Sequence, residues 1–143
     1  MRKTTKGALA ALGTMATLAG SVALSTPAQA AYTPIGVCGG GDYHVIDTSD
    51  YAFDSTVSAR TYLLWSNNLG ENCVVTFKLG SAVGNASPIS ARIQASGGTW
   101  KVDGPKPYDY YAGPVKVKAA SKCIRWGGSY GELNGTSPWE HCG

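Results

Sequence analysis

Apolar and polar residues alternate over several short stretches of the chain. Residues 89–96 (ISARIQAS) place the isoleucines and alanines on one side of an extended chain and polar residues on the other. Residues 57–65 (VSARTYLLW) and 115–118 (VKVK) show the same period of two. Such alternation is typical of a β-strand that buries one face. We therefore predict strands at these positions, and shorter ones in YHVID, GTWKVD and KCIRW.

The stretch 73–79 (CVVTFKL) shows the cleanest alternation. Successive side chains of a strand point to opposite faces, so each half of this set shares one environment. The side chains expected to point into the core are those of Cys73, Val75, Phe77 and Leu79. The side chains expected to face solvent are those of Val74, Thr76 and Lys78.

Turn-forming residues separate these stretches. Gly, Asn, Asp and Pro cluster in SNNLGEN, GSAVGNAS and DGPKP, and the pair Asn134-Gly135 suits a hairpin turn. No segment after residue 30 shows a helical period, and we expect residues 31–37 to be a loosely held lead-in. Short strands joined by such turns predict an all-β fold, a small single-domain antiparallel β-sandwich or barrel.

The first thirty residues differ from the rest. Basic residues precede an apolar run rich in Ala, Gly and Thr, which ends in Ala28-Gln29-Ala30. This is the layout of a secretory signal peptide, so we expect residues 1–30 to be removed on export, leaving a domain of residues 31–143. Of the 12 basic residues, three lie in this leader and the other nine balance the 9 acidic ones. A neutral chain lacks the field of a nucleic-acid or membrane binder, and we expect neither partner.

All of the cysteines follow the leader: Cys38, Cys73, Cys123 and Cys142. An even number in an oxidising compartment predicts two disulfides, for which three pairings exist. We favour Cys38 with Cys73 and Cys123 with Cys142, and the sequence leaves the other pairings open. No C-x-x-C pair occurs, and the acidic stretch DTSDYAFD lacks the glycine and final glutamate of an EF-hand loop. We therefore expect no metal site and no cofactor.

The stretch GGSYG at 127–131 contains the G-x-S-x-G pattern of a hydrolase nucleophile, and Glu140 and His141 follow it. That motif works on a strained turn between a strand and a helix. The residues after it, ELNGTSPWEHCG, contain Gly and Pro and do not suit a helix. Adjacent Glu140, His141 and Cys142 point in alternating directions on an extended chain, which argues against a thiol nucleophile with its base. We therefore expect no enzymatic activity, and interpret 127–131 as a glycine-rich loop with Ser129 as a turn residue.

Aromatic side chains are the most suggestive candidates for binding. Flat rings exposed on a rigid β scaffold can stack on sugar rings, and a neutral domain suits an uncharged polysaccharide. The candidate ligand-binding residues are Trp100, Tyr108, Tyr110, Tyr111 and Trp139. The alternative is that these rings fill the core and close the ends of the fold.

Three stretches resemble the spore-associated protein A family of filamentous actinobacteria: YLLWSNNLGENCVVTFK, YYAGPVKVKAASKCIRWGG and the terminal WEHCG. The likeness spans most of the chain after the leader and includes the surroundings of the cysteines. The resemblance implies a small exported protein found with spores or aerial growth. It brings no catalytic residue, ligand or cofactor with it.

Together these observations predict a secreted, disulfide-bonded, non-enzymatic protein that associates with the spore or cell surface, with a surface polymer as its partner. One alternative is a carbohydrate-binding or cell-wall-binding module that uses the exposed rings. Another is a secreted protease or lysozyme inhibitor that presents a rigid loop between residues 123 and 142.

Overall fold

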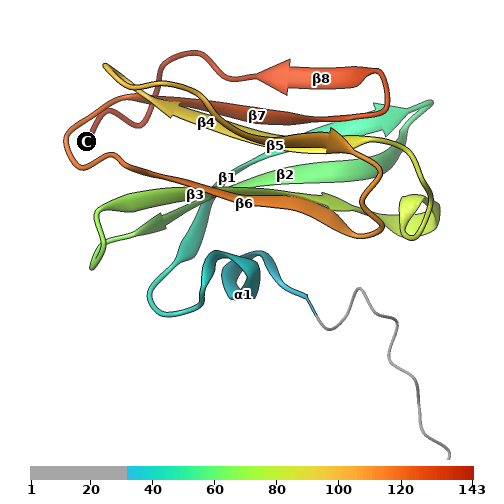
Figure 1. The fold of residues 1–143 in the computed structure, drawn as a ribbon, viewed down its shortest axis with the longest axis horizontal. Helices are drawn as coiled ribbons and strands as arrows, with labels where there is room; N and C mark the ends of the chain where they lie inside the picture. The colour runs from blue at the N-terminus through green and yellow to red at the C-terminus, as the bar shows by residue number, and fades with distance from the viewer. Residues whose placement is uncertain (1–31) are drawn as a thin grey trace, which may run out of the picture.

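The computed structural model describes residues 32–143, and the predicted leader lies outside this range. The strands in this range are β1 (His44–Phe53), β2 (Thr56–Ser66), β3 (Glu71–Lys78), β4 (Ile89–Ala95), β5 (Lys101–Lys106), β6 (Tyr111–Lys118), β7 (Ile124–Tyr130) and β8 (Leu133–Thr136). They form two antiparallel sheets that pack face to face (Figure 1). Sheet A has the order β1-β2-β3-β6, and sheet B has the order β5-β4-β7-β8. The all-β prediction is confirmed, and the fold is a sandwich with two disulfides.

The main core lies between the two sheets. Strand β4 contributes Ile89, Ala91 and Ile93, all of them fully buried, as its alternation predicted. Leu63 of β2 and Trp126 of β7 pack into the same cluster. Burying these side chains is the main driving force for joining the sheets, because each large apolar side chain contributes about 1.5–3 kcal/mol when it leaves water.

Strand β3 is buried on both faces, which corrects the prediction for residues 73–79. Val74 belongs to the core between the sheets, and Thr76 bonds there to the Thr61 side chain, with 2.8 Å between the Oγ atoms. Lys78 is fully buried on the same side, and its Nζ donates to the backbone carbonyls of Asn85, at 2.6 Å, and Tyr108. Burial lowers the pKa of this lysine.

The other face of β3 lies in a second, smaller core beneath helix α1 (Pro34–Cys38). Cys73, Val75 and Phe77 pack there with residues of α1 and β2, so they are buried as predicted, but not between the sheets. The helix has only five residues. A helix of this length is too short to show a helical period, so the sequence pattern did not predict that α1 covers this face of β3.

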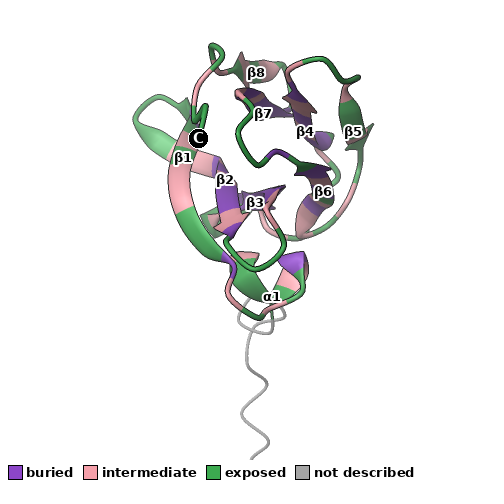
Figure 2. Ribbon diagram, turned by 90° about the vertical axis from the view of Figure 1, so that its left-hand side faces the viewer, coloured by how far each residue is buried: buried purple, intermediate pink, exposed green. Residues whose placement is uncertain are grey.

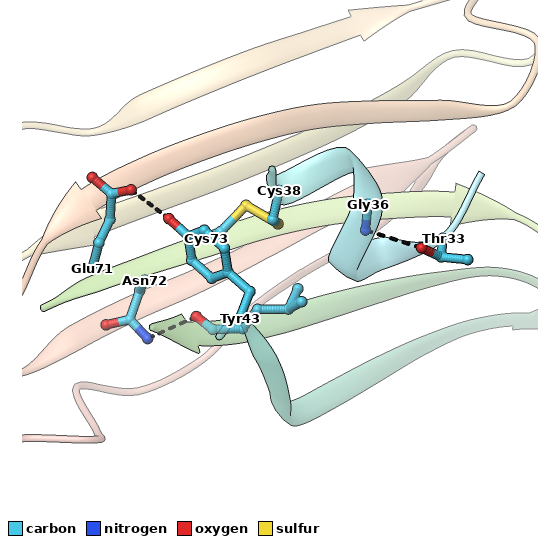
Figure 3. Close-up of a disulfide and its surroundings, with 8 residues drawn as sticks. Thr33, Gly36, Cys38, Tyr43, Glu71, Asn72 and Cys73 are labelled. Atoms are coloured by element: carbon cyan, nitrogen blue, oxygen red, sulfur yellow. Dashed lines mark hydrogen bonds between the residues drawn. A yellow bond between two sulfur atoms is a disulfide. The ribbon is translucent and has the colours of Figure 1, made fainter. Parts of the chain in front are cut away.

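Helix α1 is fixed at both ends, so residues 34–37 are not a loose lead-in. The Thr33 side chain accepts a hydrogen bond from the Gly36 amide at 2.9 Å, which caps the start of the helix. Gly39 ends it in the left-handed conformation, at φ 112°. The Cys38–Cys73 disulfide then ties the helix to β3, next to the hydrogen bond from the Tyr43 hydroxyl to Glu71 (Figure 3). The second disulfide joins Cys123 to Cys142, so the favoured pairing is confirmed.

The GGSYG stretch lies inside sheet B, which corrects its interpretation as a loop. Strand β7 continues through Ser129 to Tyr130, and Gly131 and Glu132 make the turn to β8. The pair Asn134-Gly135 is therefore part of β8 and not a turn. The predicted loop between residues 123 and 142 is largely a β-hairpin, closed by its disulfide.

Close packing explains the two glycines at the centre of this hairpin. A Cβ at Gly127 would lie 2.0 Å from the carbonyl oxygen of Gly135 on β8. A Cβ at Gly128 would lie 2.4 Å from the Ser90 carbonyl oxygen and 2.5 Å from Thr76 Oγ1. Both positions have room for a hydrogen atom only. Glycine is therefore required here because neighbouring strands pack closely, and not because the chain turns.

The C-terminal residues lie along one open side of the sandwich. Strands β1 and β8 are each an edge strand of their sheet, and Figure 2 shows the C-terminus close to β1. Glu140 pairs with Ile124 of β7 through backbone hydrogen bonds. Two residues further on, Cys142 forms its disulfide with Cys123. Within residues 32–143, no helix has the length and apolar character needed to span a membrane.

Candidate binding groove on the outer face of sheet B

The outer face of sheet B carries polar side chains from its two central strands. The inward-facing residues of β4 are buried in the core, so Ser90, Arg92 and Gln94 point to the outer face. Across the strand pair, Ser90 lies opposite Ser129, and Gln94 lies opposite Arg125. The outer face is therefore built from two adjacent rows of hydroxyl, amide and guanidinium groups.

A groove of about 590 Å³ runs over this face. Its lining includes Trp100 and Val102 on the β5 side, with Arg92 and Asn134 towards β8. Ser90 and Ser129 are nearly buried and lie on its floor. The groove thus combines one large flat ring with several groups that can donate or accept hydrogen bonds.

Arg125 contacts both tryptophans that were predicted to bind a ligand, Trp100 and Trp139. Its guanidinium carbon lies 4.8 Å from the ring centroid of Trp100 and 4.8 Å from that of Trp139. Its Nε donates to the Gln94 side chain at 2.7 Å. Cation–π contacts of this kind contribute about 0.5–1 kcal/mol at exposed sites. Trp100 and Trp139 therefore lie on one face of one sheet, held by the same guanidinium group.

Arg92 fixes the other side of the groove. Its Nη2 donates to the Gly135 carbonyl at 2.9 Å and to the Thr136 hydroxyl, and its guanidinium carbon lies 5.8 Å from the Trp100 centroid. Its Nε is buried and has no hydrogen-bond partner among residues 32–143. Trp100 therefore rests against two guanidinium groups, which limits the orientations of its ring.

Ser129 has no catalytic base beside it in this part of the chain. Its Oγ is 2.6 Å from Ser90 Oγ. His44 Nδ1 contacts the Asp42 carbonyl at 3.1 Å, and His141 contacts Asp47, so both histidines are engaged elsewhere. A serine nucleophile needs a base within hydrogen-bond reach and donors placed for the oxyanion. The G-x-S-x-G pattern here does not produce that geometry.

The three candidate tyrosines lie at a different place. Tyr108, Tyr110 and Tyr111 line a hollow of about 400 Å³ near the turn between β5 and β6, together with Tyr32. The Tyr108 hydroxyl donates to Asp103 at 2.7 Å, and this hydrogen bond raises the pKa of Tyr108. Tyr111 stacks on Phe77 with 5.2 Å between the ring centroids. Tyr111 therefore helps to close the second core.

The structure thus separates the five predicted ligand-binding residues into two groups, and their binding role remains a prediction. Four residues of this face were not predicted as site residues from the sequence: Ser90, Arg92, Arg125 and Asn134. Two of them had a usable signal, because Ser90 and Arg92 occupy the polar positions of the alternating stretch ISARIQAS. No sequence pattern could indicate that Arg125 lies beside Trp100, because this contact depends on the pairing of β4 with β7.

Comparison with known proteins gives one informative match. The chain is 33% identical over 140 residues to spore-associated protein A of Streptomyces coelicolor. The matched region covers 98% of this chain and 84% of that relative. No family model and no solved structure matches the chain. Identity at this level over nearly the whole length shows that the chain belongs to the spore-associated protein A family.

Proposed function

We propose that this protein is a non-catalytic component of the spore or cell surface that binds an uncharged, hydroxyl-rich polysaccharide in the groove of sheet B. The name of the relative supports association with spores. The two disulfides suit an oxidising environment outside the cytosol. The groove supports a polysaccharide as the bound polymer.

The observation that carries the proposal is the combination of Trp100 with Ser90, Ser129 and Asn134 in one open groove. A sugar ring has an apolar C–H face and a rim of hydroxyl groups. A flat aromatic ring can cover the first, while side-chain hydroxyls and an amide can bond to the second. Binding sites commonly have this composition, an apolar wall with a few placed polar groups.

The groove is also well ordered before any ligand arrives. Arg125 and Arg92 both lie against Trp100, and each guanidinium is itself bonded to the sheet. Little side-chain freedom at Trp100 is then left to lose on binding, and a preorganised site binds more tightly for the same contacts. The absence of a base at Ser129 within residues 32–143 supports binding without catalysis.

Retention on insoluble polymers tests the proposal. The purified protein is incubated with spore walls, peptidoglycan and chitin, and Trp100→Ala is compared with Tyr110→Ala, which alters the tyrosine hollow instead. We expect the wild type and Tyr110→Ala to be retained on at least one polymer, and Trp100→Ala to lose about tenfold or more, as for a central aromatic contact. Circular dichroism of each variant checks that the fold is kept.

The proposal fails if no polymer retains the wild type, or if Trp100→Ala is retained equally well. Loss of retention in Tyr110→Ala alone would move the site to the tyrosine hollow.

A further inference from the structure

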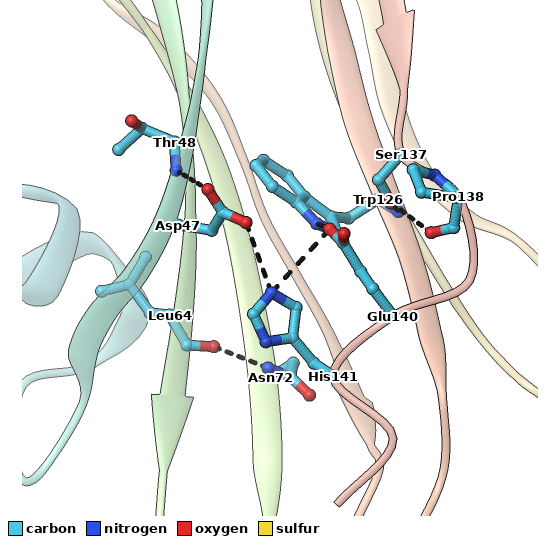
Figure 4. A network of polar contacts seen from close by, with 9 residues as sticks. All are labelled: Asp47, Thr48, Leu64, Asn72, Trp126, Ser137, Pro138, Glu140 and His141. Carbon is cyan, nitrogen blue, oxygen red and sulfur yellow. Dashed lines mark hydrogen bonds and ion pairs between the residues drawn. The ribbon is translucent and has the colours of Figure 1, made fainter.

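Three side chains of types that can ligate a metal ion converge on the open side of the sandwich (Figure 4). Asp47 comes from β1 in sheet A, while Glu140 and His141 belong to the C-terminal segment held against sheet B. His141 Nε2 lies 3.3 Å from Asp47 Oδ2 and 3.8 Å from Glu140 Oε1. One ligand atom from each of the three residues lies within 4.8 Å of the others.

We propose that Asp47, Glu140 and His141 form a Zn²⁺ site that joins the two sheets. One imidazole nitrogen and two carboxylates are a donor set that Zn²⁺ accepts, whereas Ca²⁺ and Mg²⁺ favour oxygen ligands alone. Bonds of about 2.0–2.2 Å in a tetrahedral arrangement place neighbouring ligand atoms roughly 3.3–3.6 Å apart. Two of the three separations between ligand atoms, 3.3 and 3.8 Å, lie close to this range, and all three are within 4.8 Å, so modest side-chain adjustments would complete the geometry.

Supporting contacts orient both carboxylates. The indole N–H of Trp126 donates to Glu140 Oε1 at 2.7 Å, and the Thr48 amide donates to Asp47 Oδ1 at 2.8 Å. Trp126 is only 4% exposed, so packing in the core holds its indole N–H in this position. Such outer contacts hold metal ligands in position and are a regular part of metal sites. His141 is restrained by the neighbouring disulfide at Cys142.

An ion pair without a metal explains this arrangement less well. Nε2 can carry only one proton, yet both Asp47 and Glu140 approach it, and the 3.8 Å separation from Glu140 is too long for a hydrogen bond. A divalent cation would contact both carboxylates at once. The three side chains are between 30% and 42% exposed, so an ion can enter from solvent. A fourth position would remain for water or a group from a ligand.

The sequence pattern alone predicts no metal site at these residues. His141 and Asp47 are 94 residues apart, so no spacing motif connects them. The site is also independent of the proposed polysaccharide groove, because none of its three residues lines that groove.

Calorimetric titration of the untagged protein with Zn²⁺ tests the proposal. Asp47→Asn and His141→Ala remove ligands, and His44→Ala is the matched control, an exposed histidine of β1 outside the cluster. We expect one Zn²⁺ per wild-type chain, an affinity at least tenfold weaker in Asp47→Asn and His141→Ala, and wild-type affinity in His44→Ala. Co²⁺ should give the visible absorption of a tetrahedral site in the wild type, and this should be lost in His141→Ala.

Thermal unfolding separates metal binding from a purely structural ion pair. We expect Zn²⁺ to raise the wild-type Tm in a concentration-dependent way that EDTA reverses, with no rise in Asp47→Asn. The proposal is overturned if the wild type binds no Zn²⁺, if His141→Ala binds it equally well, or if both ligand variants lower Tm while Zn²⁺ leaves the wild-type Tm unchanged.

Discussion

The side-chain oxygens of Ser90 and Ser129 lie 2.6 Å apart, on adjacent strands in the middle of sheet B. The serine of the G-x-S-x-G pattern is therefore one half of a cross-strand hydrogen bond on the floor of a groove. Pairs of this kind stabilise a sheet by about 0.2–1 kcal/mol. The neighbouring glycines permit close packing of the strands, so the whole motif can be explained without catalysis.

Ser129→Ala should leave ester hydrolysis unchanged and lower stability slightly. Removing the hydroxyl leaves Ser90 without its partner, which should cost about 1 kcal/mol in the free energy of unfolding. A chromogenic ester assay measures the first effect and urea unfolding the second. Hydrolysis by the wild type that disappears in Ser129→Ala would show that this serine is a nucleophile after all.

Gly128→Ala should destabilise the protein far more than Gly131→Ala. The new methyl group at position 128 would overlap the Ser90 carbonyl oxygen and Thr76 Oγ1, and overpacking of this kind costs about 1–3 kcal/mol or more. Position 131 has open space around it and only a positive φ of 57°, which costs an alanine about 1 kcal/mol. Denaturant unfolding of both variants measures the difference. Equal losses would contradict the packing role of Gly128.

Removing either disulfide should lower stability, and the loss should be larger for Cys38–Cys73. The sequence separations are 35 and 19 residues, for which the chain-entropy relation predicts about 4 and about 3 kcal/mol. Paired Cys→Ala variants compared by guanidinium unfolding provide the test. A larger loss for the Cys123–Cys142 pair would indicate that local packing outweighs the entropy of the unfolded chain.

Asp42 should make stability depend on pH in the acid range. Hydrogen bonds from the Ser66 hydroxyl and the Asn68 amide lower the pKa of Asp42 from its ordinary value of 3.8. The folded state then binds the proton less readily than the unfolded chain. The contribution of Asp42 is complete above its ordinary pKa and is lost as the pH falls through the lowered one.

Unfolding measured between about pH 6 and pH 2 tests this effect. We expect Asp42→Asn to show a weaker decline in stability towards acid pH than the wild type, and Ser66→Ala to lie between them. A decline of the same steepness in Asp42→Asn would assign the acid sensitivity to other carboxylates.

The sequence predicted strands best where only one face is buried. Strand β4 follows this rule, because its outer face is open and its polar residues point there. In β3 the same alternation assigned the wrong environment to Val74, Thr76 and Lys78. The polarity of Thr76 and Lys78 suggested solvent, but each is buried with hydrogen-bonding partners supplied by distant segments. Those partners depend on tertiary contacts that no local pattern contains.

The candidate sites show the same limit. Trp100 and Trp139 were identifiable as aromatic residues, but their common contact with Arg125 follows from how β4, β7 and the C-terminal segment pair. The Asp47, Glu140 and His141 cluster depends on the C-terminal segment returning to β1, so spacing could not indicate it.

Each disulfide joins a cysteine to the next cysteine in the chain, Cys38 to Cys73 and Cys123 to Cys142. Cysteines become available to an oxidant in chain order as a protein is synthesised, starting at the N-terminus. Oxidation in order of appearance therefore yields the native bonds directly. Maturation of this protein should consequently need an oxidant but no isomerase to exchange wrongly paired sulfurs.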